Sequence, residues 1–509
     1  MKRALSLLSG LLALALIASA PITAASFTDT EAGKMAIAFD DPLLDLEPLD
    51  TMAMGTAMAL DQFGCLWIWG LRKYGMAGVG VETVASEDPA SRVCLPDSRK
   101  IVTADATSQY GQNYDLTYGA AALADDGTVW TWGCYYLRLC GVGAADKDNS
   151  AGDTQYYSPQ QVTFPNLASG EKIVDLKALN NAFAALSSGG QLFTWGEATF
   201  GVLGNGTQGT NLTSPVRMLT QVHSFGTSIF CGWAIAAAGW RSGKDAASND
   251  TLSSNKAAVV FWGSNAGSYG RPSGDTSIAD TVVKSTPSAL TGTLANYLDY
   301  KDGDSTLGAN TDDNATLGVR MGSAQDGGTF QDMTGQYYGS SIRLKNGSLL
   351  SWGYGSHGAS GAGISKTGGK PALITAANPI VGLATGTEFI FYWDSAGQAY
   401  FYGERKHTDK FPREDGAPYE LPNVANLAFA IDGGTTYPAW QKGKIAKIVG
   451  FGDSAMVKRT DGLLFTVGGG REQIPSGNPY SIVRDYLLKT STTNTSVGQP
   501  ATLLDTWSR

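Results

Sequence analysis

The stretch that decides the fold is Gly190-Gln-Leu-Phe-Thr-Trp195-Gly196-Glu-Ala-Thr-Phe-Gly-Val-Leu-Gly204. It begins in a glycine turn, continues as an apolar and aromatic segment that ends in Trp-Gly, and closes in a glycine loop. Aromatic and apolar residues favour strands, and Gly accepts the backbone angles of a tight hairpin. The stretch therefore predicts a short strand that is entered from a hairpin turn.

The same strand recurs along the chain. Five copies keep the Trp-Gly ending and two end in Tyr-Gly or Val-Gly, with the anchors Trp69, Trp132, Trp195, Trp262, Trp352, Tyr402 and Val467. A turn such as Asp125-Asp126-Gly127 precedes most copies, and a strand of small and apolar residues precedes the turn. Seven units of four short strands predict an all-β fold, a seven-bladed β-propeller with four-stranded blades built from repeats of about 50–90 residues.

A solenoid is the competing repeat architecture, but it needs polar capping units, and we find none in the sequence. One tryptophan per unit, placed at the end of an interior strand, indicates packing between adjacent blades rather than a platform for sugars.

The order of strand, Asp/Asn-Gly turn, strand ending in Trp-Gly, Gly-Val-Leu-Gly (201 to 204) and a later proline resembles the repeat of the regulator of chromosome condensation family. The resemblance covers roughly residues 50 to 505, without the His usual on the small-residue strand and with a long fourth unit. It implies a propeller that acts through a protein-binding face. A secreted bacterial branch of this family consists of β-lactamase inhibitor proteins, and the founding activity is guanine-nucleotide exchange on a small GTPase.

Composition excludes several classes of protein. The 509 residues include 64 Gly, 43% are hydrophobic and 16% are charged, which is too apolar for a disordered chain. The net charge of -9 and the absence of a basic block argue against nucleic acid as a partner.

The first 25 residues have the order of a secretory signal peptide: Met1-Lys2-Arg3, an apolar run from Ala4 to Ala18, and small residues up to Ala25. The run is shorter than the roughly 20 residues of a spanning helix. We therefore expect a Sec-type signal peptide over 1–25, no membrane span, and a mature chain that is secreted, periplasmic or at the cell surface.

The remaining chain divides into two expected parts. Residues 26–50 form an N-terminal segment that we expect to contribute a strand closing the ring against the last blade. Residues 51–509 form the propeller, with an enlarged fourth unit at about 222–325. Long loops on a rigid scaffold often carry function, which directs attention to the fourth and fifth blades.

Cysteine spacing allows two disulfides. Cys65 and Cys94 fall on neighbouring strands of one blade, and Cys134 and Cys140 bracket a short loop. Cys231 is left over from an odd count of five and is expected to be a buried thiol.

Aromatic residues in the loops after Trp-Gly form the candidate partner-binding set. They are Tyr74, Tyr135, Tyr136, Phe200, Tyr269 and Tyr354. Equivalent loops gather on one face of a propeller, and rigid aromatics on one face are typical of interfaces. The alternative is that they pack over neighbouring blades.

An acidic loop is the candidate metal site, because Asp299, Asp302 and Asp304 could offer Ca²⁺ hard oxygen ligands. The spacing does not match an EF-hand, since Thr306 and Leu307 fall where an acceptor and a Gly are needed, so a solvated loop is favoured and no cofactor is expected. No catalytic residues are predicted: His357 is the best-placed histidine, but no motif surrounds it.

These patterns favour a secreted, non-catalytic binding protein that uses loops on one propeller face to bind a protein or a surface glycan. The alternative is an extracellular enzyme acting on polysaccharide or peptide, with acids of perturbed pKa converging on the central channel. A third reading is a guanine-nucleotide exchange factor.

Overall fold

The computed structural model describes residues 46–51, 56–70, 72, 74–81, 90–107, 119–133, 140–142, 156–179, 181–198, 201–220, 222–230, 233–241, 256–264, 283–289, 300–301, 330–336, 339–353, 372–385, 389–403, 419–421, 445–451, 454–460, 464–468 and 501–502. All of them belong to the compact unit Leu44–Arg509. Apart from the 3-10 helix η1 (Pro96–Ser98), the regular structure of these residues is β-strand. None of these residues forms a helix long and apolar enough to cross a membrane.

The described strands form seven antiparallel sheets, each a path of four strands that are consecutive in sequence. The first three sheets contain β1 (Leu46–Leu49), β2 (Thr56–Asp61), β3 (Leu66–Gly70) and β4 (Ser91–Val93); β5 (Ile101–Ala106), β6 (Gly119–Ala124), β7 (Val129–Gly133) and β8 (Tyr156–Val162); and β9 (Ile173–Leu179), β10 (Ala182–Ser187), β11 (Leu192–Gly196) and β12 (Leu212–Leu219). The fourth contains β13 (Val222–Phe230), β14 (Trp233–Arg241), β15 (Lys256–Ser264) and β16 (Val283–Ala289), and β17 (Tyr300–Lys301) also pairs with β15. The last three contain β18 (Phe330–Gln336), β19 (Gly339–Leu344), β20 (Leu349–Gly353) and β21 (Ala372–Ile374); β22 (Ile380–Thr385), β23 (Phe389–Asp394), β24 (Ala399–Gly403) and β25 (Tyr419–Leu421); and β26 (Ile445–Phe451), β27 (Ser454–Arg459), β28 (Leu464–Gly468) and β29 (Ala501–Thr502).

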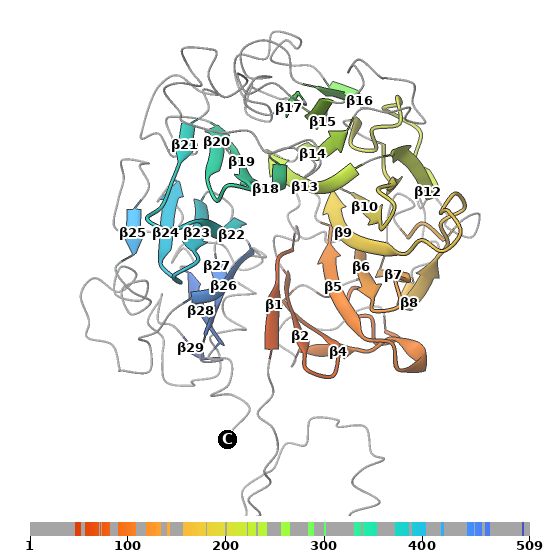
Figure 1. Cartoon of the computed structure of the whole chain (residues 1–509). Helices are drawn as coiled ribbons and strands as arrows, with labels where there is room; N and C mark the ends of the chain where they lie inside the picture. The colour runs from red at the N-terminus through yellow and green to blue at the C-terminus, as the bar shows by residue number, and fades with distance from the viewer. Residues whose placement is uncertain are drawn as a thin grey trace, which may run out of the picture. The chain divides into compact units, whose positions relative to one another are not determined.

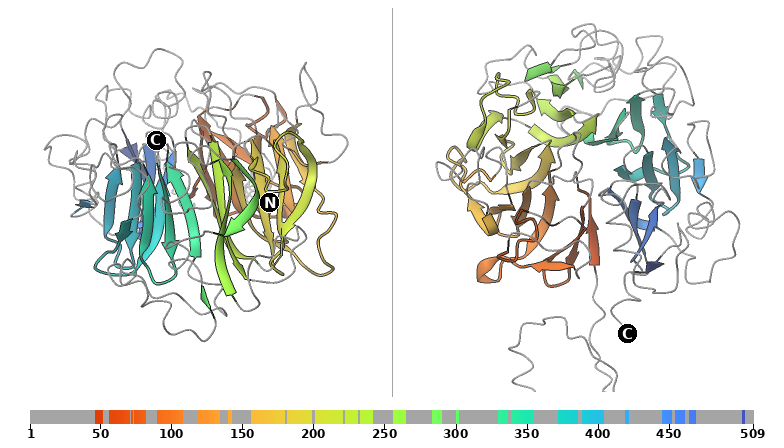
Figure 2. Two further views of the ribbon diagram at one scale, coloured as in Figure 1. Left: turned by 90° about the horizontal axis from the view of Figure 1, so that it is seen from above. Right: turned by 180° about the vertical axis from the view of Figure 1, so that it is seen from behind.

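Within this unit the sheets are the blades of a β-propeller. The first strand of each sheet contacts the first strand of the next, in the order β1, β5, β9, β13, β18, β22 and β26, and β26 contacts β1. Figure 1 shows these strands around the centre with later strands further out, and Figure 2 shows the blades from above and from behind. The prediction of an all-β propeller whose blades are four antiparallel strands is confirmed.

The predicted hairpin turns join the second and third strands. In five sheets a glycine closes the turn by donating its N–H to the carbonyl three residues earlier and has a positive φ, at Gly64, Gly127, Gly190, Gly347 and Gly397. The carbonyls of Gly64, Gly190, Gly347 and Gly397 then accept the first strand N–H of the next sheet. Each such turn therefore also connects two blades. We call the end of the blades that carries these turns the hairpin face.

The tryptophan at the end of the third strand packs against the preceding blade, as the sequence predicted. Trp132 Nε1 donates to the carbonyl of Met76 (3.0 Å), and Trp262 Nε1 donates to the carbonyl of Val202 (2.9 Å). Both indoles are almost fully buried. The acceptors lie in the glycine loops that follow β3 and β11, so the strand ending and the loop of the repeat are two halves of one contact between blades.

Tyr402 replaces the tryptophan in the sixth sheet, at the same register opposite Ile390. Its hydroxyl lies 2.6 Å from Ser341 Oγ and 2.8 Å from Ser351 Oγ in the fifth sheet, and all three side chains are buried. Burial raises the pKa of Tyr402, which keeps the phenol protonated and able to hydrogen bond. The tyrosine thus makes a polar contact between blades where the other sheets use an indole.

The described part of the segment 26–50 consists of the strand β1 and Asp50. β1 pairs with β2 in the first sheet, and the last described sheet is completed by β29. Side chains of β1 lie against β26 and β27. The described strands of the first and last blades therefore meet through side-chain contacts of β1, and the closing role of residues 26–50 stays a prediction.

Candidate functional site

The first strands carry charged residues at recurring positions that face the centre of the ring. In β9, Ile173, Leu176 and Ala178 are buried, whereas Asp175 and Lys177 between them are half-buried. A register shift in the β9–β10 pairing sets this alternation, and the strands β5, β13, β18, β22 and β26 show the same shift. Charges at these positions therefore come together from strands far apart in sequence.

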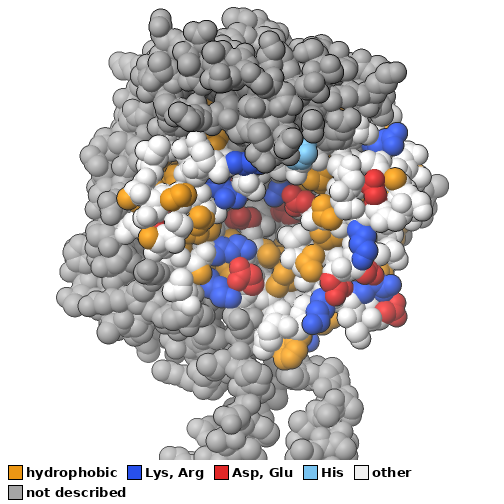
Figure 3. Space-filling model, viewed as in Figure 1, with side chains coloured by type: hydrophobic (Ala, Val, Ile, Leu, Met, Phe, Trp, Pro, Cys, Tyr) orange, Lys and Arg blue, Asp and Glu red, His pale blue; other side chains and the backbone are white. Residues whose placement is uncertain are grey.

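We call these charges, together with Asp50 after β1 and the cations Arg343 and Lys458 on the second strands β19 and β27, the channel cluster. It comprises Glu47, Asp50, Asp105, Asp175, Lys177, Asp332, Arg343, Lys447 and Lys458. Figure 3 shows acidic and basic side chains on the walls of a hollow at the centre of the described residues.

Glu47 joins the first and last sheets. Its Oε2 accepts a hydrogen bond from Lys458 Nζ on β27 (2.9 Å), and its Oε1 lies 3.2 Å from Lys447 Nζ on β26. Lys458 is the more buried of the two lysines, with 14% of its side chain exposed. One carboxylate therefore links two lysines across the junction of the first and last sheets.

Asp332 and Arg343 form the closest pair within one sheet. Arg343 Nη2 lies 2.7 Å from Asp332 Oδ2, and Arg343 Nε contacts both carboxylate oxygens at 3.2 and 3.3 Å. The two residues stand opposite each other on β18 and β19. This forked geometry commits both charges to each other.

Lys177 has a weaker partner. Its Nζ is 3.9 Å from Asp175 Oδ2 and 5.8 Å from the ring centre of Phe225 in the next sheet. The nearby carboxylate of Asp175 raises the pKa of Lys177. The lysine therefore stays charged inside the channel.

Asp105 connects two neighbouring blades through backbone groups. Its Oδ2 accepts the N–H of Ala178 in the third sheet (2.7 Å), and its Oδ1 accepts the N–H of Ala106 (2.8 Å). The side chain is buried. The role of Asp105 visible in the structure is to hold β5 against β9.

Asp50 differs from the other channel acids. It directly follows β1 and makes no hydrogen bond or ion pair with another described residue. Part of its surface is reached by solvent, although many protein atoms surround it. The protein around it raises its pKa to about 6; desolvation is the largest cause, the acids Asp105 and Asp332 add to it, and Lys447 and Lys177 oppose it. Asp50 is thus the carboxylate of the cluster without a paired cation.

The enzyme alternative required acids of perturbed pKa in the channel. Asp50 meets that description, but Glu47, Asp175 and Asp332 lie beside cations and Asp105 binds backbone N–H groups. Among the described residues, no three His, Cys, Asp or Glu side chains are placed to hold a metal ion. The described cluster therefore holds blades together and leaves one acid available.

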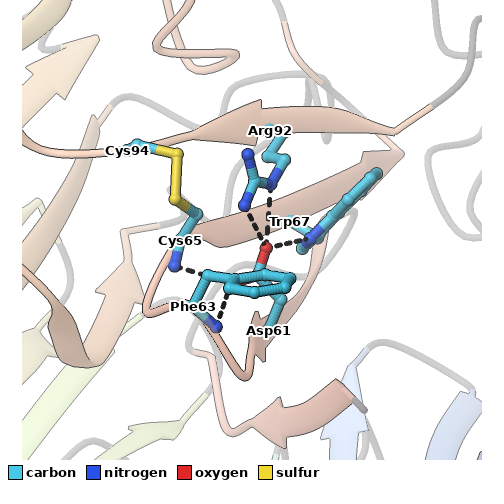
Figure 4. Close-up of a disulfide and its surroundings, with 6 residues drawn as sticks. All are labelled: Asp61, Phe63, Cys65, Trp67, Arg92 and Cys94. Carbon is cyan, nitrogen blue, oxygen red and sulfur yellow. Dashed lines mark hydrogen bonds and ion pairs between the residues drawn. A yellow bond between two sulfur atoms is a disulfide. The ribbon is translucent and has the colours of Figure 1, made fainter. Parts of the chain in front are cut away.

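A second polar network stabilises the hairpin of the first blade (Figure 4). Asp61 Oδ1 accepts the N–H groups of Phe63 (3.0 Å) and Cys65 (2.9 Å). Asp61 Oδ2 accepts Trp67 Nε1 (3.0 Å) and Arg92 Nε (2.8 Å). The turn is held rigidly, while 57% of Phe63 remains exposed on the hairpin face.

The disulfide predicted between Cys65 and Cys94 is present in the structure and ties β3 to the end of β4. Cys140 is also disulfide-bonded. Its expected partner Cys134 lies outside the described residues, as does Cys231.

The aromatic partner-binding set stays a prediction. Tyr74 is half-buried and has a φ of 56° in the loop after β3. Tyr135, Tyr136, Phe200, Tyr269 and Tyr354 lie outside the described residues, and so do the acidic loop with Asp299, Asp302 and Asp304 and the histidine His357.

The channel cluster was missed by the sequence analysis, although a signal was present. Asp105, Asp175, Lys177, Asp332 and Lys447 each interrupt an otherwise apolar or small-residue segment just before the small-residue strand of a repeat. Reading charges by repeat register would have found them.

With this geometry established, comparison with known proteins shows that one part of the chain matches this type of repeat. The family model described as the regulator of chromosome condensation (RCC1) repeat matches residues 189–238, which confirms the predicted resemblance. The guanine nucleotide exchange factor SRM1 of Saccharomyces cerevisiae is 32% identical over 104 residues, covering 16% of this chain and 21% of that protein. The chain thus matches about a fifth of the length of this relative.

Solved structures show the same fold over most of the chain. Human WBSCR16 has a TM-score of 0.53 at 14% identity, covering 81% of this chain and 86% of that one. Yeast Prp20p has a TM-score of 0.51 at 17% identity (87% and 94%), and yeast RCC1 (Prp20) bound to Kap60 has 0.52 at 16% identity (92% and 98%). At such identities the likeness concerns the fold.

Proposed function

We propose that this chain is an exported, non-catalytic, seven-bladed propeller that binds a partner protein through one face of its ring. The seven sheets and the cyclic contacts of their first strands support a closed ring of seven blades. The charged start and apolar run of residues 1–25 support export.

The observation that carries the binding role is a set of exposed apolar side chains on the hairpin face. Val102 (49% exposed), Val174 (53%) and Val381 (45%) follow the first residue of three inner strands, and Phe63 lies in a turn at the same end of the blades. Apolar side chains that gather on one rigid face are typical of protein interfaces. Similar propellers are described with protein partners, Kap60 for yeast RCC1 and Gsp1p for Prp20p.

The test is a pull-down from the host's extracellular fraction with the chain lacking residues 1–25, beside one variant for each face. The hairpin-face variant changes Val102, Val174 and Val381 to Ser, and the other variant changes the loop residue Tyr74 to Ala. We expect a protein that the unchanged chain and Tyr74→Ala capture and the hairpin-face variant loses. Capture of no protein, or equal capture by the hairpin-face variant, would contradict the proposal; loss with Tyr74→Ala alone would assign binding to the aromatic loops.

Guanine-nucleotide exchange is the second candidate, favoured by the 32% identical segment shared with SRM1. Release of a fluorescent GDP analogue from small GTPases of the host, accelerated at catalytic amounts of the chain, would establish it. Detection of the chain in the extracellular fraction would count against it.

A further inference from the structure

The turn between β2 and β3 carries the most exposed large apolar side chain of the described residues. Phe63 is 57% exposed there, on the hairpin face. Asp61 Oδ1 fixes the turn by accepting the N–H groups of Phe63 and Cys65. The disulfide between Cys65 and Cys94 ties the same place to the end of β4. A ring that is already held in place loses little conformational entropy when a partner covers it.

Arg92 lies beside this ring on β4 (Figure 4). Its Cζ is 6.0 Å from the ring centre of Phe63 and 5.9 Å from that of Trp67, which stands opposite Arg92 on β3. Arg92 Nε and Nη2 both lie 2.8 Å from one oxygen, Oδ2 of Asp61. The two rings and the carboxylate therefore hold the guanidinium in one orientation.

One edge of the guanidinium is open to another group. Arg92 Nη1 makes no hydrogen bond or ion pair with a described residue, and 40% of the side chain is exposed. A guanidinium has five N–H donors, and Asp61 accepts only from Nε and Nη2. The donors on Nη1 and the second donor on Nη2 form a planar fork that matches the two oxygens of a carboxylate.

The charges around the turn also favour an anion. Lys100 lies next to the turn, since a Cβ added to Gly64 would meet Lys100 Cβ, and its ammonium group makes no ion pair with a described residue. The acids nearby already accept hydrogen bonds, Asp61 from Arg92 and Asp125 from the N–H of Lys100. The net charge of -9 belongs to the whole chain, whereas physiological salt screens exposed charges beyond about 8 Å. The two cations therefore decide which group can bind at this turn.

We propose that Phe63 and Arg92 bind an acidic residue of the partner protein, Asp or Glu, together with an apolar side chain next to it. The carboxylate pairs with the open fork of Arg92, and the apolar side chain covers the ring of Phe63. The inference rests on the proposed binding function and names the chemistry of the partner. Aromatic residues and arginine are enriched at the centres of protein interfaces. Covering Phe63 also excludes water around the new ion pair, which strengthens it.

The experiment uses a matched pair of peptides as probes, acetyl-Gly-Leu-Glu-Gly-amide and the same peptide with Gln in place of Glu, which is similar in shape but uncharged. Binding to the full chain is followed by ligand-observed NMR at pH 7.5. We expect the glutamate peptide to bind about tenfold more tightly than the glutamine peptide. Arg92→Lys keeps a positive charge beside Asp61 but removes the fork, so it should reduce this preference to about twofold. Phe63→Ala should weaken the binding of both peptides and keep their ratio.

Arg99→Lys is the control variant. Arg99 also lies over an indole, with its Cζ 5.6 Å from the ring centre of Trp130. Its guanidinium is already bound by two carboxylates, Asp97 at 2.6 Å and Asp126 at 2.7 Å. This variant should therefore keep the preference of the unchanged chain, and melting temperatures show that all three variants are folded.

Four results would overturn the inference: equal affinity for the two peptides, no binding of either, a preference that survives Arg92→Lys, or a preference that Arg99→Lys reduces equally. Inorganic phosphate is added as a competitor. Tighter binding of phosphate than of the glutamate peptide would assign the fork to a phosphate group and would also overturn the inference.

The pull-down separates this inference from the proposed function. If Arg92→Lys and Phe63→Ala capture the partner as well as the unchanged chain does, the binding function stands and this inference fails. If no partner is captured but the glutamate peptide binds through Arg92, the site at the turn stands and the protein-binding function fails.

Discussion

Replacing Gly141 by Ala should destabilise the propeller, because the added Cβ would clash with the indole of Trp195 in the next sheet. Gly141 has a φ of 69°, and a Cβ at this position would lie 2.6 Å from Cδ1 and 2.7 Å from Nε1 of Trp195 in the next sheet. The indole cannot withdraw, because it is fully buried against Phe164 and Phe183, each with its ring centre 5.7 Å away. Positive φ costs about 1–2 kcal/mol for Ala, and overpacking adds about 1–3 kcal/mol.

Gly170→Ala is the matched control. Gly170 has a φ of 83°, and an added Cβ there meets nothing within 4 Å, so this variant carries the backbone cost without the clash. In urea unfolding followed by tryptophan fluorescence, Gly141→Ala should lower the free energy of unfolding by about 2–5 kcal/mol and Gly170→Ala by about 1–2 kcal/mol. Equal losses would refute the claim that the glycine loop and the tryptophan are one contact between blades.

Three further outcomes are expected. Cys65→Ser with Cys94→Ser should lower the free energy of unfolding by about 3.5 kcal/mol, the loop-closure value for their separation of 29 residues; a loss below about 1 kcal/mol in urea unfolding would mean that the other contacts of β4 suffice. Glu47→Gln should lower the free energy of unfolding by about 1 kcal/mol at low salt and leave it unchanged in 1 M NaCl, because the ion pairs of Glu47 are partly exposed. A loss of stability that does not depend on salt would contradict a stabilising role of these ion pairs. Asp50→Asn should leave the melting temperature unchanged at pH 4 and raise it at pH 8. The reason is that the folded-state pKa of Asp50, about 6, lies above the usual 3.8, so the folded protein loses stability as pH rises and the carboxyl group ionises. A variant that is no more stable than the unchanged chain at pH 8 would refute this.

The hairpin turns and the third strands of the blades were predictable, because their sequence pattern recurs in several repeats. The turn before each Trp-Gly strand needs residues that accept a positive φ, and Gly127, Gly190 and Gly347 have it. The third strand needs apolar and aromatic residues, and Val129–Gly133 and Leu192–Gly196 form it. Even the inter-blade role of Trp132 followed from its position at the end of an interior strand.

The ring-closing strand shows where this reasoning ends. The sequence predicted a strand near residue 50, and β1 is there. Its pairing partner was not predicted, because a four-residue strand has no pattern of its own that distinguishes β2 from a strand of the last blade. Pairing is decided by which partner is near in space and can bury the same side chains, and here β2 follows β1 closely along the chain.

The sequence by itself determined the repeat, the hairpin turns, the strand order within each blade and the cysteines that pair in the first blade, because all of these depend on residues close together in the chain. Only the tertiary structure decided the channel cluster. Glu47 meets Lys458, and Asp105 meets Ala178, only when the blades close around a centre. Coulomb energy depends on distance in space rather than along the chain, so the ion pairs of Glu47 with Lys447 and Lys458 could not be inferred from the sequence.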